Sequence, residues 1–486
     1  MSRIKNFLTI GIIIFGVFQI KANISDTLLT HYGLSSDYFE IVTVKEAKKD
    51  VFRNLFSDAI KPSDTIIIAK VDTFKNDLII KNKLLKHRLI LSGKVFKKGV
   101  SFRSSKFQNE VFMNECTFYG RVDFGKATFD STLILWKTKF YNAGVFSHAS
   151  FNGIQFHDTQ FFEDVQFYSV QFKGGAFFIS TKFKKEVLFN NSYFYDYTNF
   201  GLSEFDRKPM FWQTIFLDTL VFYSVKLKSG IDFQSSKFGH LLGLHNLESN
   251  GKIDLSDVSL PYYTDLTSIK TDVVIDFNFI RDSIATSIYK VNIYDTDINK
   301  LMLTDKFDLY FNDYLSLDIK NGIYKELLDN LFKKGYKNLY RSFDIEYKRF
   351  IYENYNQFSE RISYLIGRTW WNFGYNKQRV FLWTLIFIFL FSIPIRLKFN
   401  LFVEKVYRYD KLLIRLRANR KLNNSIIRFL LDYWLAFVYT IFVFFNLKLD
   451  FDKLSFNNYF ASAFILIIYV LGLICTAFIV NLVITI

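Results

Sequence analysis

Phenylalanine recurs with a fixed period between about residues 102 and 238 of this 486-residue chain. Two interleaved series run through the stretch, and the steps between them alternate between five and six residues, which gives a period of eleven. The first series comprises Phe107, Phe118, Phe129, Phe140, Phe151, Phe161, Phe172, Phe183, Phe194, Phe205, Phe216, Leu227 and Phe238. Both series lose one residue together between Phe146 and Phe161, and the register then resumes. Self-similarity at a fixed period predicts a repeat architecture, in which neighbouring repeats stack on one another.

The residues between the phenylalanines favour short strands and turns over a helix. They are mainly Ser, Thr, Asn, Asp, Lys and Gly, with β-branched and aromatic types among them, which is typical of strands separated by turns. A small side chain precedes most first-series residues by two positions, so both should face the same side of a strand. An ordinary Phe-rich sandwich or barrel is the alternative, but its strand lengths would vary. The period therefore predicts a right-handed β-helix of four short sides over residues 101–240, with the first series as its structural ladder.

Three of the repeats, Lys126–Phe129, His148–Phe151 and Ser180–Phe183, resemble pentapeptide repeats in a phenylalanine-rich form. The resemblance lies in the sustained register, not in any single unit. It implies a right-handed quadrilateral β-helix. The chain uses Phe where Leu is usual in these repeats, and it takes six-residue steps, so a distorted cross-section is expected.

The segments on either side of the repeats are predicted to close the ends of the β-helix. Residues 23–100 are assigned to an N-terminal cap with the first, irregular coils, and residues 241–318 to an irregular β C-terminal cap. Such caps cover strand edges that the terminal coils would otherwise expose. Helical spacing then predicts a stalk and a juxtamembrane aromatic segment over residues 319–378, with Gly335 ending the first helix.

Residues 1–22 have the pattern of a secretory signal peptide. Arg3 and Lys5 precede an apolar run from Phe7 to Ile20, which is the order of charge and hydrophobicity in an export signal. Ile20 stands where a small residue is usual before a cleavage site, so an uncleaved N-terminal anchor is the alternative. Either form predicts export of the chain that follows.

Residues 379–486 are predicted to form a membrane domain. Apolar spans are expected near residues 380–396, 427–446 and 459–483, since about twenty apolar residues cross a bilayer. Polar residues stand at the start of the middle segment, so a re-entrant pore helix is its alternative. Trp370, Trp371 and Tyr375 precede the first span among several cations, which is typical of a membrane interface, although a packed aromatic turn is also compatible.

The loop between the first two spans carries nine Lys and Arg residues against two acidic residues over residues 396–421. The positive-inside rule places this loop in the cytoplasm. The β-helix is then extracytoplasmic, in agreement with the export signal. These observations predict a multi-pass protein of the inner membrane with a periplasmic β-helix, and the basic loop is expected to contact anionic membrane lipid.

The order of the segments resembles bacterial pentapeptide-repeat membrane proteins, some of which carry a two-span pore-loop domain related to potassium channels. The stretch that corresponds to the ion filter runs from Tyr439 to Asn446 and has no glycine, whereas a carbonyl filter needs backbone conformations that glycine makes easy. Potassium selectivity is therefore not expected. The polar residues that could line a pore or hold a bundle together are Arg428, Asp432, Thr440 and Asn481.

No catalytic, cofactor-binding or metal-binding motif occurs in the sequence, and its two cysteines lack partners at metal-ligand spacing. Enzyme activity, a cofactor and nucleic-acid binding are therefore not expected, although the formal net charge is +16. Two hypotheses remain. The first is a membrane-anchored scaffold whose β-helix binds an unknown protein partner. The second is a homo-oligomeric channel-like or sensor protein that the β-helix regulates.

Overall fold

The computed structural model describes residues 25–43, 64–281, 288–355, 358–419, 424–447, 455 and 458–484. They form two compact units, Met1–Phe343 and Asp344–Ile486, with the boundary inside helix α3 (Lys337–Asn354). The signal peptide predicted for residues 1–22 lies outside the described residues.

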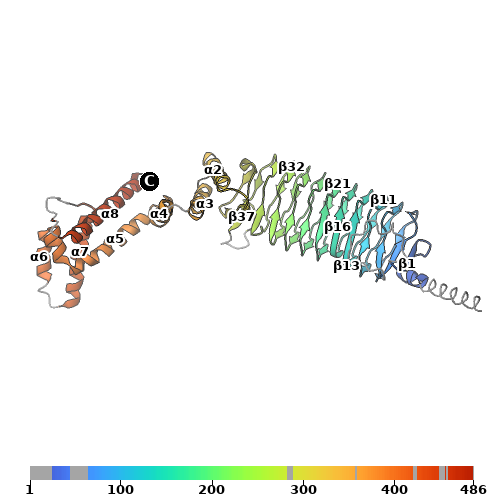
Figure 1. Ribbon diagram of the computed structural model, residues 1–486, viewed down its shortest axis with the longest axis horizontal. Coiled ribbons are helices and arrows are strands. Elements are labelled where there is room, and N and C mark those ends of the chain that lie inside the picture. Colours follow the sequence, from blue (N-terminus) through green and yellow to red (C-terminus); the bar gives the residue numbers. More distant parts are fainter. Residues whose placement is uncertain are drawn as a thin grey trace, which may run out of the picture. The chain divides into compact units, whose positions relative to one another are not determined.

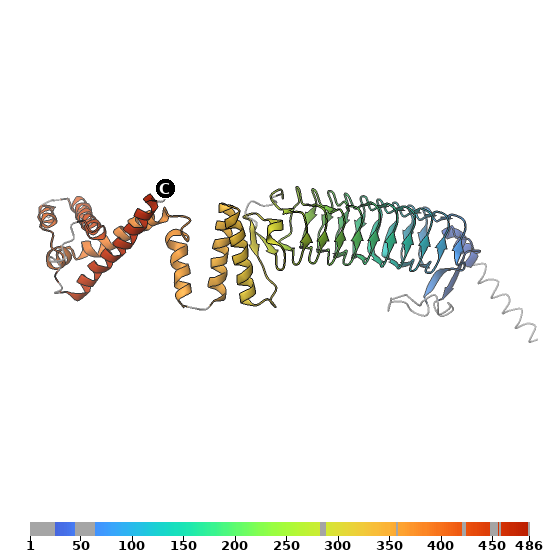
Figure 2. The ribbon, with the colours of Figure 1, turned by 90° about the horizontal axis from the view of Figure 1, so that it is seen from above.

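The first unit contains a β-solenoid of about 11 turns, as predicted (Figure 1). Its parallel strands pair with strands about 22 residues away, so one coil takes two of the eleven-residue periods. For example, β11 (Thr117–Phe118) pairs with β14 (Lys139–Phe140), and Phe118 stands opposite Phe140. Figure 2 shows the same coils from a second direction. The right hand of the winding and the quadrilateral cross-section remain predictions.

The phenylalanine ladder occupies the interior of the coils. All thirteen members of the first series are at most 2% exposed. Eleven of them are at most 1% exposed and form its central part, namely Phe107, Phe118, Phe129, Phe140, Phe151, Phe161, Phe172, Phe183, Phe194, Phe205 and Phe216. Rings of successive coils lie face to face: the centroid of Phe183 is 5.2 Å from that of Phe161 and 4.8 Å from that of Phe205. A coil alone would expose these rings, so it is the stacking that buries them.

The one-residue loss in the phenylalanine period corresponds to a single coil that is one residue shorter than the coils next to it. Strand β13 (Thr128–Trp136) pairs with β16 (Ser150–His157), and the register shifts between Phe129 opposite Phe151 and Thr132 opposite Gly153. A Cβ on Gly153 would lie 2.8 Å from the Thr132 hydroxyl, so this shorter crossing needs a glycine. The next coils resume the 22-residue pairing, as in Gln160 opposite Lys182.

The small residues two positions before each ladder residue form hydrogen bonds with the backbone. Their buried hydroxyls donate to carbonyls of the preceding coil, as from Ser105 Oγ to Ile80 O at 2.8 Å and from Thr214 Oγ1 to Phe189 O at 2.9 Å. Ser192 Oγ also accepts from the Val170 N–H at 2.9 Å. The side chain at this position, here called the small-residue slot, therefore satisfies backbone groups that burial would otherwise leave unpaired.

One residue in each turn before that slot adopts a left-handed backbone conformation. The φ angles lie between 51° and 60° at Ser104, Glu115, Lys126, Lys137, His148, Asp158, Ser169, Ser180, Asn191, Leu202, Gln213, Ser224 and Ser235. This conformation costs roughly 1–2 kcal/mol for a residue other than glycine. Packing of the coil on its neighbours must offset that cost, because the position is occupied by residues as different as Leu202, Lys126 and Glu115 and not by glycine.

The coils extend beyond residues 101–240, for which the phenylalanine series predicted them. Pairing with a spacing of 22 begins with β2 (Thr65–Ala69), which pairs with β6 (Arg88–Ile90), and it continues past β32 (Glu248–Ser249). The last strand is β39 (Phe307–Leu309). On the N-terminal side Phe74 and Phe96 continue the ring stack, whereas after residue 240 aliphatic residues such as Leu242, Leu244 and Leu247, which are at most 1% exposed, fill the interior. At the N-terminal end β1 (Phe39–Thr43) pairs antiparallel with β2 (Thr65–Ala69).

Two helices follow the solenoid. Helix α2 (Leu317–Lys333) ends two residues before Gly335, whose φ is 74°. The N–H groups of Gly335 and Tyr336 donate to Phe332 O and Leu331 O. These two bonds close the helix end in the way that glycine favours. Helix α3 begins two residues later.

The second unit is helical. It comprises the end of α3, α4 (Phe358–Ile366), the π-helical turn η3 (Gly367–Trp371), α5 (Arg379–Leu397), η4 (Leu401–Val406), α6 (Asp410–Asn419), α7 (Ser425–Phe444) and α8 (Tyr459–Ile484). Among the described residues three helices are long and apolar enough to cross a membrane, namely α5, α7 and α8. The prediction of three apolar helical segments in this part of the chain is confirmed.

Candidate functional sites

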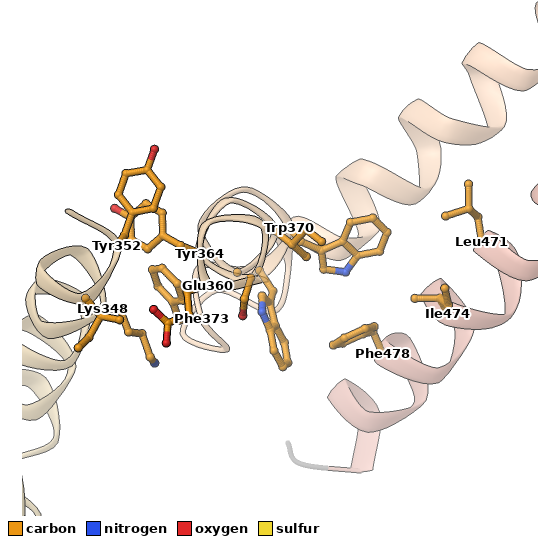
Figure 3. A pocket seen from close by; sticks show the side chains of 14 residues that line it. Lys348, Tyr352, Glu360, Tyr364, Trp370, Phe373, Leu471, Ile474 and Phe478 are labelled. Carbon is orange, nitrogen blue, oxygen red and sulfur yellow. The ribbon is translucent and has the colours of Figure 1, made fainter. Parts of the chain in front are cut away.

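A pocket of about 700 Å³, here called the tryptophan pocket, lies within the second unit. Its walls come from the end of α3, α4, η3, the turn after η3 and the second half of α8 (Figure 3). Most of the lining is apolar or aromatic, and the residues that carry the following argument are Lys348, Glu360, Trp370, Phe373, Ile474 and Phe478. Large apolar pockets with a few polar groups are the usual form of small-molecule sites.

A tight reversal after η3 shapes this pocket. Asn372, Phe373 and Gly374 all have positive φ angles, of 51°, 55° and 93°, and the Phe373 N–H donates to Gly367 O at 2.7 Å. The ring of Phe373 folds back over Gly367, where a Cβ would lie only 2.7 Å from it. The aromatic sequence around the tryptophans is therefore a folded turn, and the Tyr375 hydroxyl ties it to Asp344 on α3 at 2.7 Å.

The two tryptophans of this turn face α8. The ring of Trp371 lies edge-on to Phe478 with centroids 4.7 Å apart, and Trp370 lies 6.2 Å from the same ring. Both tryptophans are half-buried. The structure thus has the packed aromatic turn that was the alternative to a membrane interface, and a position at an interface remains a prediction.

Two polar atoms at the pocket are buried without a hydrogen-bond partner among the described residues. They are the indole N–H of Trp370 and the Oε2 atom of Glu360. The indole of Trp383 provides a contrast, since its N–H donates to Thr369 O at 2.9 Å. Lys348 is already engaged, because it pairs with Asp344 at 2.5 Å and lies 4.9 Å from the Phe373 ring centroid. Buried polar groups are normally paired, so the two orphaned atoms point to an absent ligand or water.

The contacts between the apolar helices show the direction in which each of them runs. Helices α5 and α8 are antiparallel, because Phe391 near the end of α5 contacts Phe464 near the start of α8 at 5.7 Å. Helix α7 also begins where α5 ends, since the Arg396 guanidinium lies 3.9 Å from the Phe429 ring centroid. Helices α7 and α8 therefore run in the same direction.

The end of α7 lies beside the middle of α8. A Cβ on Gly472 would be 1.7 Å from the carbonyl oxygen of Phe444, the last residue of α7. Gly472 is roughly 20 Å from the start of α8 at 1.5 Å per residue. Ser455, however, donates its N–H to Val406 O at 2.8 Å, back at the end where α5 finishes. Ser455 therefore lies at the end of the unit from which α7 starts, whereas Leu447 follows the opposite end of that helix.

The predicted polar residues of the membrane domain do not converge on one point. Thr440 is fully buried and its hydroxyl donates to Ala436 O within α7 at 2.8 Å. Asp432 accepts from Asn419 Nδ2 at 3.2 Å, and among the described residues it forms no ion pair with Arg428, which is exposed on α7. One helical turn separates Arg428 from Asp432, which would allow an ion pair, but the half-buried Asp432 bonds to α6 instead. Asn481 is exposed on α8.

One outer face of the solenoid carries an apolar patch. Tyr193 and Tyr195 are 37% and 43% exposed, and Leu217 on the next coil is 49% exposed. This Tyr193–Leu217 patch is flanked by the exposed Lys173 and Lys237 on neighbouring coils. Aromatic side chains at the centre of a patch with a charged rim are characteristic of protein-binding surfaces.

On the outer side of another sheet, which contains Lys182 and Glu204, acidic and basic side chains pair with one another. Lys228 Nζ lies 2.8 Å from Glu204 and 2.7 Å from Asp206, and Lys184 lies 3.2 Å from Asp206. Lysines and acids alternate along that sheet, as in Lys182, Glu204, Lys226, Glu248 and Lys270. Charges that already pair with one another leave little for a charged partner to gain.

Within the part of the chain that the structure describes, no three His, Cys, Asp or Glu residues form a group that could hold a metal ion. Both cysteines are free and buried. Complete burial raises the pKa of Cys116 to about 12, so this thiol is not an activated nucleophile. The absence of enzyme activity remains a prediction.

Comparison with known protein families finds a match within the solenoid. The sequence model described as pentapeptide repeats (9 copies) matches residues 92–139. No curated protein and no solved structure shows significant similarity to the chain.

Proposed function

Since the chain carries pentapeptide repeats in a β-solenoid and three helices that could cross a membrane, we propose that it is a non-enzymatic, membrane-anchored scaffold. The solenoid presents a rigid outer surface to a protein partner. Its interior is filled by stacked rings, so a partner binds the outside. The observation that carries the proposal is the Tyr193–Leu217 patch.

The chemistry of the patch indicates the kind of partner. Tyrosine side chains supply large contact areas at a low cost in conformational entropy. The rings of Tyr193 and Tyr195 lie 6.2 Å apart, and the Tyr195 hydroxyl donates to Gln171 Oε1 at 2.8 Å, which fixes the ring before any partner binds. The flanking lysines favour a partner surface with an apolar centre and carboxylates at its rim.

A photo-cross-linking amino acid tests this surface in cells that express the full chain. At position 195 we expect one discrete adduct with another protein, and the added substitution Leu217→Lys should abolish it. Position 119 is the matched control. Tyr119 is 45% exposed, but its ring already stacks on Tyr141 at 5.1 Å and lies under Lys97. Equal labelling at 119 and 195, or no adduct at 195, would contradict the proposal.

The orientation proposed for this scaffold is a periplasmic solenoid anchored in the inner membrane of a bacterium. The support for it is the excess of cations between α5 and α7, where Lys398, Lys405, Arg408, Lys411, Arg415 and Arg417 are described. Cations on the inner side of the membrane obey the positive-inside rule.

The direction of α7 favours a second candidate, a channel-like protein. If α5 and α8 both cross the bilayer, they cross in opposite directions. The segment between them, which contains α7, then begins and ends on the same side of the membrane. A helix that enters and leaves on the same side is the re-entrant alternative to a third span. Such a unit has only two crossing helices, so a pore would require several copies of the chain.

This pore would not select potassium. Residues Tyr439–Phe444 are helical, and the carbonyls of Ile441, Phe442 and Val443 accept from the N–H groups of Phe445, Leu447 and Asn446. Carbonyls engaged in this way cannot replace the hydration shell of an ion.

Three single cysteines test the orientation and the re-entrant arrangement together. They are placed at Lys237, Arg415 and Tyr459 in a background with Cys116→Ser and Cys475→Ala, and intact spheroplasts are treated with an impermeant thiol reagent. We expect labelling at 237 and protection at both 415 and 459. Opposite results at 415 and 459 would instead support three simple spans, and labelling at 415 with protection at 237 would reverse the orientation.

A further inference from the structure

The tryptophan pocket combines apolar walls with a small number of unsatisfied polar atoms. The side chains of Leu471, Ile474 and Phe478 on α8 form one wall, and Tyr352, Tyr364 and Phe373 lie across from them (Figure 3). Tyr352 stacks on Tyr364 with centroids 4.3 Å apart, so this aromatic wall is preformed. Apolar surface of this kind favours a hydrocarbon chain or a ring system.

The α8 wall belongs to a helix that could cross a membrane. Ile474 is 42% exposed and Leu473 beside it is 45% exposed, and the most apolar 18-residue stretch of Tyr459–Asn481 has a mean hydropathy of 2.9. The apolar surface of the pocket is therefore continuous with that of α8. One part of a bound molecule can contact the pocket while another part contacts membrane lipid along α8. This continuity identifies the ligand as a membrane amphiphile.

The orphaned atoms define the head group. Glu360 Oε2 needs a hydrogen-bond donor, and the indole N–H of Trp370 needs an acceptor. A hydroxyl donates one hydrogen bond, and an ester carbonyl accepts one. An ammonium group offers no acceptor for Trp370.

A charged head group fits less well. The Glu360 carboxyl repels an anion, and the positive charge of Lys348 that could compensate a phosphate is already neutralised by Asp344. Burial of an ion with so little compensation is costly. An uncharged head with both a hydroxyl and an ester satisfies the two orphaned atoms without that cost.

We propose that the tryptophan pocket binds a neutral acylglycerol of the membrane. A head-group hydroxyl donates to Glu360, an ester carbonyl accepts from the Trp370 indole, and the acyl chain lies against Ile474 and Phe478. The pocket thus binds a lipid at the junction between α4 and the apolar helices, a property distinct from protein binding by the solenoid.

The proposal is tested by titrating the detergent-purified full chain with 1-oleoylglycerol and measuring the bound fraction by native mass spectrometry. We expect saturable binding of one molecule. Trp370→Phe removes the N–H and keeps an aromatic ring, so it should weaken binding about fivefold to tenfold, the effect of one lost hydrogen bond. Trp383→Phe is the matched control and should leave binding unchanged, because Trp383 does not line the pocket.

A second variant separates loss of the site from loss of the fold. Ile474→Trp fills the pocket from the α8 side, so it should abolish binding while the melting temperature stays at or above that of the parent. Parent-like binding by both Trp370→Phe and Ile474→Trp would overturn the proposal. Tighter binding of 1-oleoyl-lysophosphatidylglycerol or of the corresponding lysophosphatidylethanolamine would overturn the assignment of a neutral head.

Discussion

Phe183→Asp should be among the most destabilising single substitutions in the solenoid. The side chain is 1% exposed, and its ring stacks between those of Phe161 and Phe205. Loss of a buried phenylalanine costs about 3–5 kcal/mol, and an unpaired buried carboxylate adds to that cost. We expect a destabilisation of at least about 5 kcal/mol, measured by thermal unfolding of the purified chain with circular dichroism.

Two neighbouring substitutions control for this result. Phe183→Leu should cost far less, because Leu227 occupies the equivalent position opposite Phe205. Lys185→Asp changes an exposed side chain two residues away and should alter stability by less than about 0.5 kcal/mol. Lys184 is a poorer control, since its ammonium pairs with Asp206 at 3.2 Å. A Phe183→Asp protein that melts like the parent would show that the ladder is not the core.

Gly472→Leu is expected to have a comparable effect on the second unit. Even a Cβ at this position would lie 1.7 Å from Phe444 O, a backbone atom that cannot move unless α7 and α8 separate. Replacing glycine within a helix normally gains about 1 kcal/mol. Overpacking costs about 1–3 kcal/mol, and forced separation of two helices exceeds that range. The net result should be a loss of more than about 3 kcal/mol, measured by the unfolding of the detergent-purified chain followed by tryptophan fluorescence.

Ala477→Leu is the matched control for Gly472→Leu. Ala477 lies five residues further along the same helix and is exposed, so a larger side chain there meets no neighbouring backbone. Its effect should stay within about 0.5 kcal/mol. Equal stability of the two variants would mean that α7 and α8 are not in close contact.

The solenoid was predictable because the signal is local and repeated. Each phenylalanine marks one inward position, and the same spacing recurs often enough to fix the register, including the shortened crossing at Gly153. The outer coils on the C-terminal side were predicted only as an irregular β cap, because Leu242, Leu244 and Leu247 do not stand out from the background as phenylalanine does. The hydroxyl bonds, such as that from Thr214 to Phe189 O, depend on carbonyl positions that appear only when coils stack.

The membrane unit shows where sequence reasoning fails. Composition predicts α5, α7 and α8 as apolar helices, since hydropathy needs no tertiary information. The direction of α7 depends on contacts between distant residues, such as Ser392 Oγ with the Tyr433 hydroxyl at 2.7 Å. For a related reason, Glu360 could not be singled out from the sequence. It is one acid in a charged stretch, and only the fold brings it to the same pocket as Trp370.

The 22-residue spacing between paired strands has a consequence for how the solenoid forms. Most strands of the solenoid pair with a strand one coil away, as Thr117 pairs with Lys139, so the loops that must close during folding are short and of nearly constant length. Folding rates rise when contacts are local in sequence. A nascent chain needs only about two coils, roughly 44 residues, before a first pair of ladder rings can stack. The solenoid can therefore grow coil by coil as the chain emerges, without waiting for its C-terminal end.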